Sequence, residues 1–204
     1  LPALVLAESA DEVVASLQQD WAVAQYELTG DDQIDAFESL IQRADAAVEA
    51  NARSAEILIW NGIIKSSFAG VKGGLGALSM VKAAKTSLEA AMEIDVTALD
   101  GSAYTSLGAL YYQVPGWPVG FGSDKKAVQL LQKGLEINPN GIDSNYFYAD
   151  YLLHKSEYEQ AERYLLKAQN AAPRSNRPLA DSGRRQEIEA ALSLAREKMR
   201  RQGS

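Results

Sequence analysis

The chain has 204 residues, of which 47% are hydrophobic and 23% charged, a composition typical of globular domains. Twenty Lys and Arg stand against 27 Asp and Glu, and the net charge of −7 argues against a dedicated nucleic-acid-binding protein. There is no Cys and one His, His154, so disulfides, cysteine nucleophiles and multi-histidine metal sites are excluded, and we expect no cofactor.

The first segment, residues 1–7, is apolar and ends in Val5-Leu6-Ala7. This ending fits a signal peptidase site, so we expect the tail of an export signal, with cleavage after Ala7. That interpretation places the protein in the periplasm or otherwise outside the cytoplasm. The alternative is an apolar arm that packs on the first helix of a cytoplasmic protein. Residues 8–204 are predicted to form a single helical domain.

Helical periodicity dominates this domain, and strand-like alternation is never sustained. The predicted helices alternate between two sets. The first set comprises 9–28, 54–68, 101–113 and 143–154. The second set comprises 32–50, 79–95, 124–137 and 157–171. A last helix at 181–201 has one apolar stripe, typical of a capping helix, with Asp181 or Ser182 as its N-cap.

Helices of the second set share a spacing of small and apolar residues. The residues that recur at an offset of 34 are Ala127, Leu131, Gly134 and Pro139, then Ala161, Leu165, Ala168 and Pro173. The same spacing, without the proline, starts at Ala84 and, more weakly, at Leu40. Steps of four and three place the first three residues on one helix face, where small side chains let a neighbouring helix come close.

Helices of the first set carry a matching pattern, clearest at Leu107, Gly108 and Tyr111. The two patterns together resemble the tetratricopeptide repeat, a helix-turn-helix unit of about 34 residues. The resemblance implies an all-α, right-handed helical solenoid of about four such units plus a C-terminal capping helix. We therefore predict that Ala127, Gly134, Ala161 and Ala168 are closely packed at helix crossings.

Two units are longer than the repeat, which predicts inserted loops at 68–78 and 114–122. The glycines of the first loop lack the spacing of a phosphate-binding loop. Insertions at equivalent points of stacked repeats should lie side by side and form one surface. The candidate binding residues of this surface are Phe68, Lys72, Tyr111, Tyr112, Trp117 and Phe121. The alternative is that Trp117 and Phe121 fold back and fill the gap that the insertion opens.

A second candidate region is the concave groove of the solenoid, where we expect Tyr104, Asn145 and Tyr148 beside Tyr111. The rings of helix 143–154 are Tyr146, Phe147, Tyr148 and Tyr151. They either form the core between repeats or line this groove. His154 and the acidic residues at helix starts are expected to be solvent-exposed, so we predict a protein without catalytic residues or a metal site.

The motifs KGGLGAL, LGALYYQVPGWPVGFG and NGIDSNYFYAD resemble those of exported bacterial tetratricopeptide proteins that are similar to the T component of TRAP transporters. This resemblance implies a periplasmic binding or scaffolding partner of a transport system. Two classes of function stay open. A scaffold would take a protein or peptide partner in the concave groove. A small-molecule binder would hold an apolar ligand under the two loops. A homo-oligomer is compatible with both.

Overall fold

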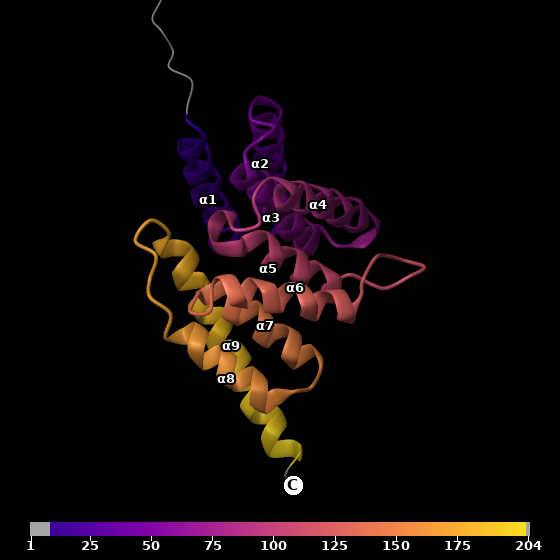
Figure 1. Ribbon diagram of the computed structural model, residues 1–204, viewed down its shortest axis with the longest axis vertical. Helices are drawn as coiled ribbons and strands as arrows, with labels where there is room; N and C mark the ends of the chain where they lie inside the picture. Colours follow the sequence, from indigo (N-terminus) through magenta and orange to yellow (C-terminus); the bar gives the residue numbers. More distant parts are fainter. Residues whose placement is uncertain (1–8, 203–204) are drawn as a thin grey trace, which may run out of the picture.

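The computed structural model describes residues 9–202, and α-helices account for most of that range (Figure 1). Within these residues the helices are, in chain order, α1 (Ala10–Tyr26), α2 (Gly30–Ala50), α3 (Ala55–Lys72), α4 (Gly74–Ile94), α5 (Ala98–Gln113), α6 (Asp124–Ile137), α7 (Ile142–His154), α8 (Tyr158–Gln169) and α9 (Pro178–Gln202). Residues 9–202 contain no β-strand, so the all-α fold class is confirmed. Residues 1–7, the expected export signal or apolar arm, lie outside the described residues.

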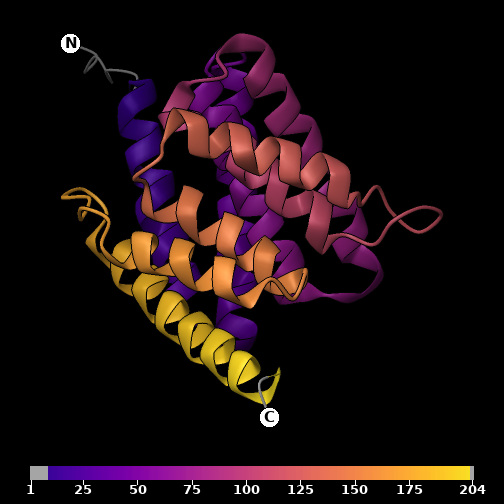
Figure 2. The same cartoon turned by 60° about the horizontal axis from the view of Figure 1, so that its bottom comes forward.

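Consecutive helices pair into four hairpins, α1–α2, α3–α4, α5–α6 and α7–α8, and the hairpins stack on one another (Figures 1 and 2). Each of α3, α5 and α7 contacts the preceding odd-numbered helix, so α1, α3, α5 and α7 form an inner layer. The even-numbered helices form the outer layer, and each contacts the next hairpin. This is the tetratricopeptide-type stack that the repeat spacing predicts. None of the helices within residues 9–202 is both long and apolar enough to span a bilayer.

The small residues of the repeat lie where helices cross. Ala127, Ala161 and Ala168 are completely buried and Gly134 is buried beside Thr105, which confirms their predicted close packing. Large side chains at these positions would push the helices apart.

Two hairpins are held by the same pair of residue types, a glycine on the inner helix and a leucine on the outer one. A Cβ atom on Gly62 would lie 2.6 Å from Cγ of Leu88, and one on Gly108 would lie 2.7 Å from Cγ of Leu131. Real Cβ atoms do not approach that closely, so glycine is what allows α3 to touch α4 and α5 to touch α6 at this depth.

Serine side chains define the starts of three helices. Ser9 forms a capping box with Glu12 at α1, while Ser54 and Ser123 accept hydrogen bonds from backbone amides at the starts of α3 and α6. Each cap satisfies an amide that has no partner inside the helix. The last helix starts differently from our expectation: α9 begins at Pro178, which suits the first helical position, and Asp181 lies inside the helix.

The segment 68–78 differs from the expected loop, because α3 and α4 both continue through it and only Gly73 separates them. Gly73 and Gly74 have φ angles of 60° and 64°, in the left-handed region that glycine tolerates. The chain thus reverses within two residues, and the extra residues lengthen the two helices. The segment 114–122 is a true loop that projects from the stack (Figures 1 and 2).

Candidate ligand-binding groove

A cavity of about 920 Å³ lies on the inner side of the helical stack. Its walls come from α1, α3, α5 and α7, and it is completed by the segment 172–177 and the start of α9. The inner helices of all four hairpins therefore contribute to one space.

The last helix closes this space. In addition to packing on α7 and α8, α9 reaches back to α1, the first helix of the stack. At the contact Gly183 lies so close to Tyr26 that a Cβ atom there would be 2.3 Å from Cδ1 of the ring. Figure 2 shows α9, in yellow, running along the stack beside α8. An open solenoid has an open concave side; here α9 covers part of that side, and the groove remains partly open.

Aromatic residues form the wall contributed by α1 and α3. The rings of Trp21 and Trp60 meet edge to face, with centroids 5.5 Å apart, and Trp21 also meets Tyr26 at 5.7 Å. The indole Nε1 of Trp21 donates a hydrogen bond of 2.8 Å to Oγ of Ser67. The remaining wall mixes hydroxyl and amide side chains with apolar ones. The polar members include Gln25, Ser66, Ser102, Ser106 and Gln113.

A cluster of charged side chains occupies the end of the cavity near α7 and α9. Asp143 accepts hydrogen bonds from Nη1 of Arg174 at 2.7 Å and from Nε of Arg184 at 2.9 Å. Arg174 also binds Asp181, and Arg184 also binds Glu187. Burial acts to raise the pKa of Asp143, but Arg184 and Arg174 outweigh it and hold that pKa well below its usual range. The cluster is thus a set of ion pairs that joins α7 to α9.

The aromatic residues of α7 divide between groove and core. Tyr148 and Tyr151 are buried in the core between hairpins, while Tyr146 and Phe147 line the cavity. The guanidinium of Arg184 lies over both cavity rings, 4.4 Å from the centroid of Tyr146 and 4.7 Å from that of Phe147. The core interpretation therefore holds for Tyr148 and Tyr151, and the groove interpretation holds for Tyr146 and Phe147. Burial raises the pKa of Tyr146 to about 12, although Arg184 acts to lower it.

Two buried donors in the cavity wall have no hydrogen-bond partner among the described residues: Nε1 of Trp60 and Nε of Arg177. They are neighbours, since the guanidinium carbon of Arg177 lies 4.9 Å from the Trp60 ring centroid. Burial, followed by the charge of Arg174, lowers the pKa of Arg177. No carboxylate within residues 9–202 forms an ion pair with Arg177, in contrast to Arg174 and Arg184.

None of the candidate binding residues named from the sequence lies in the cavity wall. Those buried elsewhere are Phe68, Tyr111, Tyr112, Asn145 and Tyr148. Lys72 pairs with Glu38 at 3.0 Å, and Tyr104 lies under Nζ of Lys133. The amide of Asn145 is used locally, because it donates to the carbonyls of Pro139 and Gly141. His154 is exposed, as expected.

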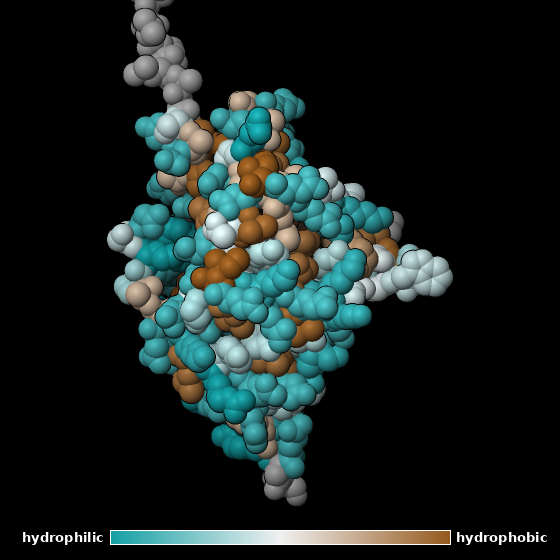
Figure 3. Space-filling view, viewed as in Figure 1, coloured by the Kyte–Doolittle hydropathy of each residue, from teal (hydrophilic) through white to brown (hydrophobic). Residues whose placement is uncertain are grey.

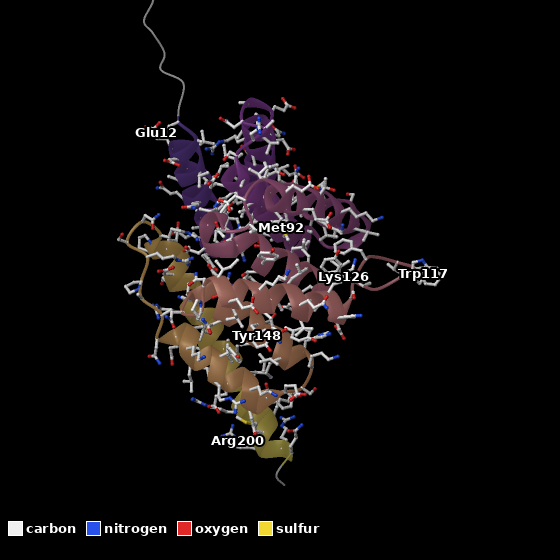
Figure 4. All side chains as sticks on the ribbon, in the orientation of Figure 1. Glu12, Met92, Trp117, Lys126, Tyr148 and Arg200 are labelled. Carbon is white, nitrogen blue, oxygen red and sulfur yellow. The ribbon has the colours of Figure 1, made fainter. Side chains whose placement is uncertain are left out.

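The projecting loop separates Trp117 from Phe121. Phe121 folds back onto Tyr111 with ring centroids 5.4 Å apart, so the gap-filling interpretation holds for it. Trp117 is 90% exposed near the tip of the loop, so that interpretation is wrong for Trp117 (Figure 4). The space-filling view shows the loop standing clear of a mostly hydrophilic face (Figure 3).

Glycines fix the base of this loop. Backbone atoms of Val114 and Pro115 approach Gly122 and Gly120 so closely that a Cβ atom on either glycine would lie within 2.4 Å of a carbonyl oxygen. Gly122 donates a backbone hydrogen bond of 3.0 Å to Pro115. Both insertions lie at the same edge of the stack (Figure 1). That they form one functional surface stays a prediction.

The sequence gives little indication of the groove that the structure contains. Its most unusual residues, Arg174 and Arg177, precede α9 in a polar segment that looks like an ordinary solvated connection. Gly183 lies inside a predicted helix, where glycine lowers the helix propensity, and its sequence neighbours do not indicate a contact. The one local signal is the Trp21 and Trp60 pair, whose large rings fall on the inner helices of adjacent hairpins.

Stacked helical hairpins around an inner groove define the fold class as an all-α helical solenoid of tetratricopeptide-like units. No protein-family model matches the chain, and no curated protein matches its sequence. Two solved structures are similar in fold. "Crystal structure of MamA" is 18% identical, with 83% of this chain and 92% of that chain covered and a TM-score of 0.47. "Crystal structure of MamA protein" is 17% identical, with 93% and 94% covered and a TM-score of 0.48.

Proposed function

We propose that this is a non-catalytic binding protein that holds a small organic ligand in the inner groove. The observation that carries the proposal is the cavity on the inner side of the stack, which α9 covers in part through its contact with α1. A cavity of about 920 Å³ is of the size that small-molecule sites have in proteins, roughly 300–1,000 Å³. Its mixture of aromatic walls and a few polar groups is also typical of such sites.

This geometry favours the small-molecule class over a partner helix in the groove. A helix with its side chains is about 10–12 Å across, and α9 already covers part of the concave side that such a partner would occupy. The groove also differs in place from the pocket expected under the insertion loops, because it lies on the inner face of the stack.

Two titratable groups of the wall, Asp143 and Tyr146, support binding rather than catalysis. Asp143 is held ionised by its two arginines, and Tyr146, with a pKa of about 12, stays protonated at neutral pH. A general acid or base works best with a pKa near the operating pH. These two groups are placed to hold charge and orientation instead of exchanging protons.

The wider role that we propose follows the motif resemblance: an exported protein that hands its ligand to, or takes it from, a transport system. Trp117 supports a protein contact in that role. It is 90% exposed on a loop whose base is fixed by glycines, and Trp is enriched among the residues that dominate protein interfaces. Cell fractionation of the native protein tests the location, and cross-linking from position 117 tests the contact.

The groove itself is tested by native mass spectrometry of the protein purified from its own cells. We expect a bound small molecule in the wild-type protein. Ser106→Trp, which places a large ring inside the cavity, should abolish the bound mass. Gln132→Trp is the matched control, because Gln132 is exposed on α6 outside the cavity wall. A ligand retained equally by both variants would contradict the proposed site.

A further inference from the structure

The three arginines at the closed end of the groove are not equivalent. Arg174 binds Asp143 and Asp181, and Arg184 binds Asp143 and Glu187. Arg177 lines the same cavity but has no carboxylate partner within the described chain. Its guanidinium lies over the face of the Trp60 ring. One guanidinium is therefore left with its charge unmatched by direct pairing.

The neighbouring donor is unmatched as well. Trp60 is 2% exposed, and its Nε1 has no hydrogen-bond acceptor among residues 9–202. A buried N–H without an acceptor loses its hydrogen bonds to water and gains none in return, which is why most buried polar groups are paired. Both orphans are donors, both belong to the cavity wall, and they lie against each other. An acceptor placed between these two side chains would give both donors a partner.

We propose that the ligand of the groove carries a carboxylate, and that the guanidinium of Arg177 and the indole N–H of Trp60 bind it. This rests on the proposed function, that the groove holds a small organic ligand, and it names the chemical class. A planar carboxylate matches the fork of N–H donors on a guanidinium. Association with an anion would also offset the burial and the repulsion from Arg174 that lower the pKa of Arg177.

The surrounding charges argue for a single negative charge. Arg177 is the guanidinium of this cluster without an ion pair among the described residues, so one negative charge is enough to match it. The rest of the ligand would face aromatic and hydroxyl groups, among them Trp21 and Ser106. Free organic acids and the C-terminus of a short peptide share this chemistry, and the cavity volume of about 920 Å³ favours the free acid.

The test uses the three indole N–H signals of the full-length protein labelled with ¹⁵N-tryptophan, assigned through Trp21→Phe and Trp117→Phe. The probes are four carboxylates, each beside its neutral amide: acetate, hexanoate, benzoate and indole-3-acetate. We expect at least one acid to shift the Trp60 signal and to bind about tenfold or more tightly than its amide, since the amide lacks the charge. The tripeptide Ala-Ala-Phe and its C-terminal amide form a second arm.

Substitutions at Arg177 then separate the contribution of its charge to binding from the contribution of its guanidinium geometry. Arg177→Gln should weaken binding of the acid about tenfold or more and leave the amide unchanged, while Arg177→Lys should retain part of the affinity. Arg163→Gln is the matched control, because Arg163 is exposed on α8 and the change in net charge is the same. Circular dichroism melting checks that each variant is folded, and the acid-against-amide comparison needs no variant.

The outcomes are distinct. If no acid or peptide exceeds its amide, or if Arg177→Gln binds as wild type, the carboxylate site is overturned. The groove would still be a binding site if native mass spectrometry shows a neutral ligand that Ser106→Trp excludes. If only the peptide with a free C-terminus shifts Trp60, the carboxylate site holds and its source is a peptide. The absence of any bound mass in the native protein counts against the proposed function itself.

Discussion

The hairpin crossings and the contact between α9 and α1 both hold helices together, but with different side chains. At two of the crossings a glycine meets a leucine of the adjacent helix, as Gly108 meets Leu131, and the contact is apolar and buried. At the closure the contacts join residues far apart in the chain. A glycine meets a tyrosine there, and a chain of ion pairs runs from α7 through Arg174 and Arg184 to α9.

The difference shows that stacking and closure are separable. Packing supplies most of the stability of the stack, because apolar burial dominates folding free energy. Electrostatic pairing and one small residue determine whether the groove is closed. Changes at the crossings should therefore unfold the protein, while changes at the closure should alter ligand retention at a smaller cost in stability.

The largest effect is expected at a crossing. Leu131→Ala removes a side chain that is 1% exposed, and we expect the free energy of unfolding to fall by about 2–5 kcal/mol, measured by urea denaturation. Adding Gly108→Ala to Leu131→Ala should restore part of the loss, since the new methyl group enters the space that Leu131 vacates. Leu166→Ala, at a position 36% exposed, is the control and should cost far less. Strict additivity of the double variant would contradict the proposed contact.

The second largest effect on stability is expected at the charge cluster around Asp143. Asp143→Asn leaves Arg174 and Arg184 with one fewer partner, and we expect a loss of about 2–3 kcal/mol, below the usual cost of breaking a fully buried pair because Asp143 is partly accessible. The exposed pair of Lys155 and Asp124 provides the control. Asp124→Asn should change stability by less than about 0.5 kcal/mol.

The stabilities of the wild type and of Asp143→Asn should also differ in their dependence on pH. The pKa of Asp143 is depressed in the folded state, so its contribution is fully present above the unfolded pKa of about 4 and is lost as the pH falls further. The difference in stability between the wild type and Asp143→Asn should therefore be constant from pH 7 to about pH 5 and shrink towards pH 2. A difference that grows on acidification would contradict the role of Asp143.

A smaller effect is expected at the closure itself. Gly183→Ala places a methyl group against the Tyr26 ring, and we expect a loss of about 1–3 kcal/mol together with a faster release of the groove ligand. Gly76→Ala is the matched control: Gly76 lies outside the cavity wall, its Cβ would meet only Cδ of Lys72 at 4.0 Å, and the change adds helix propensity to α4. Equal effects of the two substitutions would show that the closure is not tight at Gly183.

The smallest effect on stability is expected at the projecting loop. Trp117→Ala should change the free energy of unfolding by less than about 0.5 kcal/mol, because the ring is 90% exposed. Phe121→Ala, which removes a ring packed on Tyr111, should cost roughly 1–3 kcal/mol. Thermal or urea denaturation measures both changes in the free energy of unfolding. A large loss for Trp117→Ala would mean that the loop packs against the stack in solution.

Local spacing in the sequence predicts the stack well. The pattern of Ala127, Leu131 and Gly134 lies within one helix and concerns one neighbour, so the helix-face argument applies directly. The predicted helices accordingly match the observed ones closely, apart from the early start of α9 and the continuation of α3 and α4 through 68–78. There the deviation arises because Gly73 and Gly74 reverse the chain within two residues.

The closure and the groove have no comparable local signal. Gly183 and Tyr26 are far apart in the chain, and their contact depends on the accumulated curvature of four hairpins. The arginines near α9 look like solvated charges until the fold brings Asp143 beside them. Large aromatic residues do indicate the groove, through Trp60. Their pattern in the sequence points equally to Trp117, which is exposed, and to Tyr111, which is buried elsewhere.

The return of α9 to α1 also changes how the molecule unfolds. In an open array each repeat touches only its neighbours, so terminal repeats fray first and hydrogen exchange is fastest at the ends. Here both ends of the stack are tied to each other, which favours a single cooperative transition over stepwise loss of repeats.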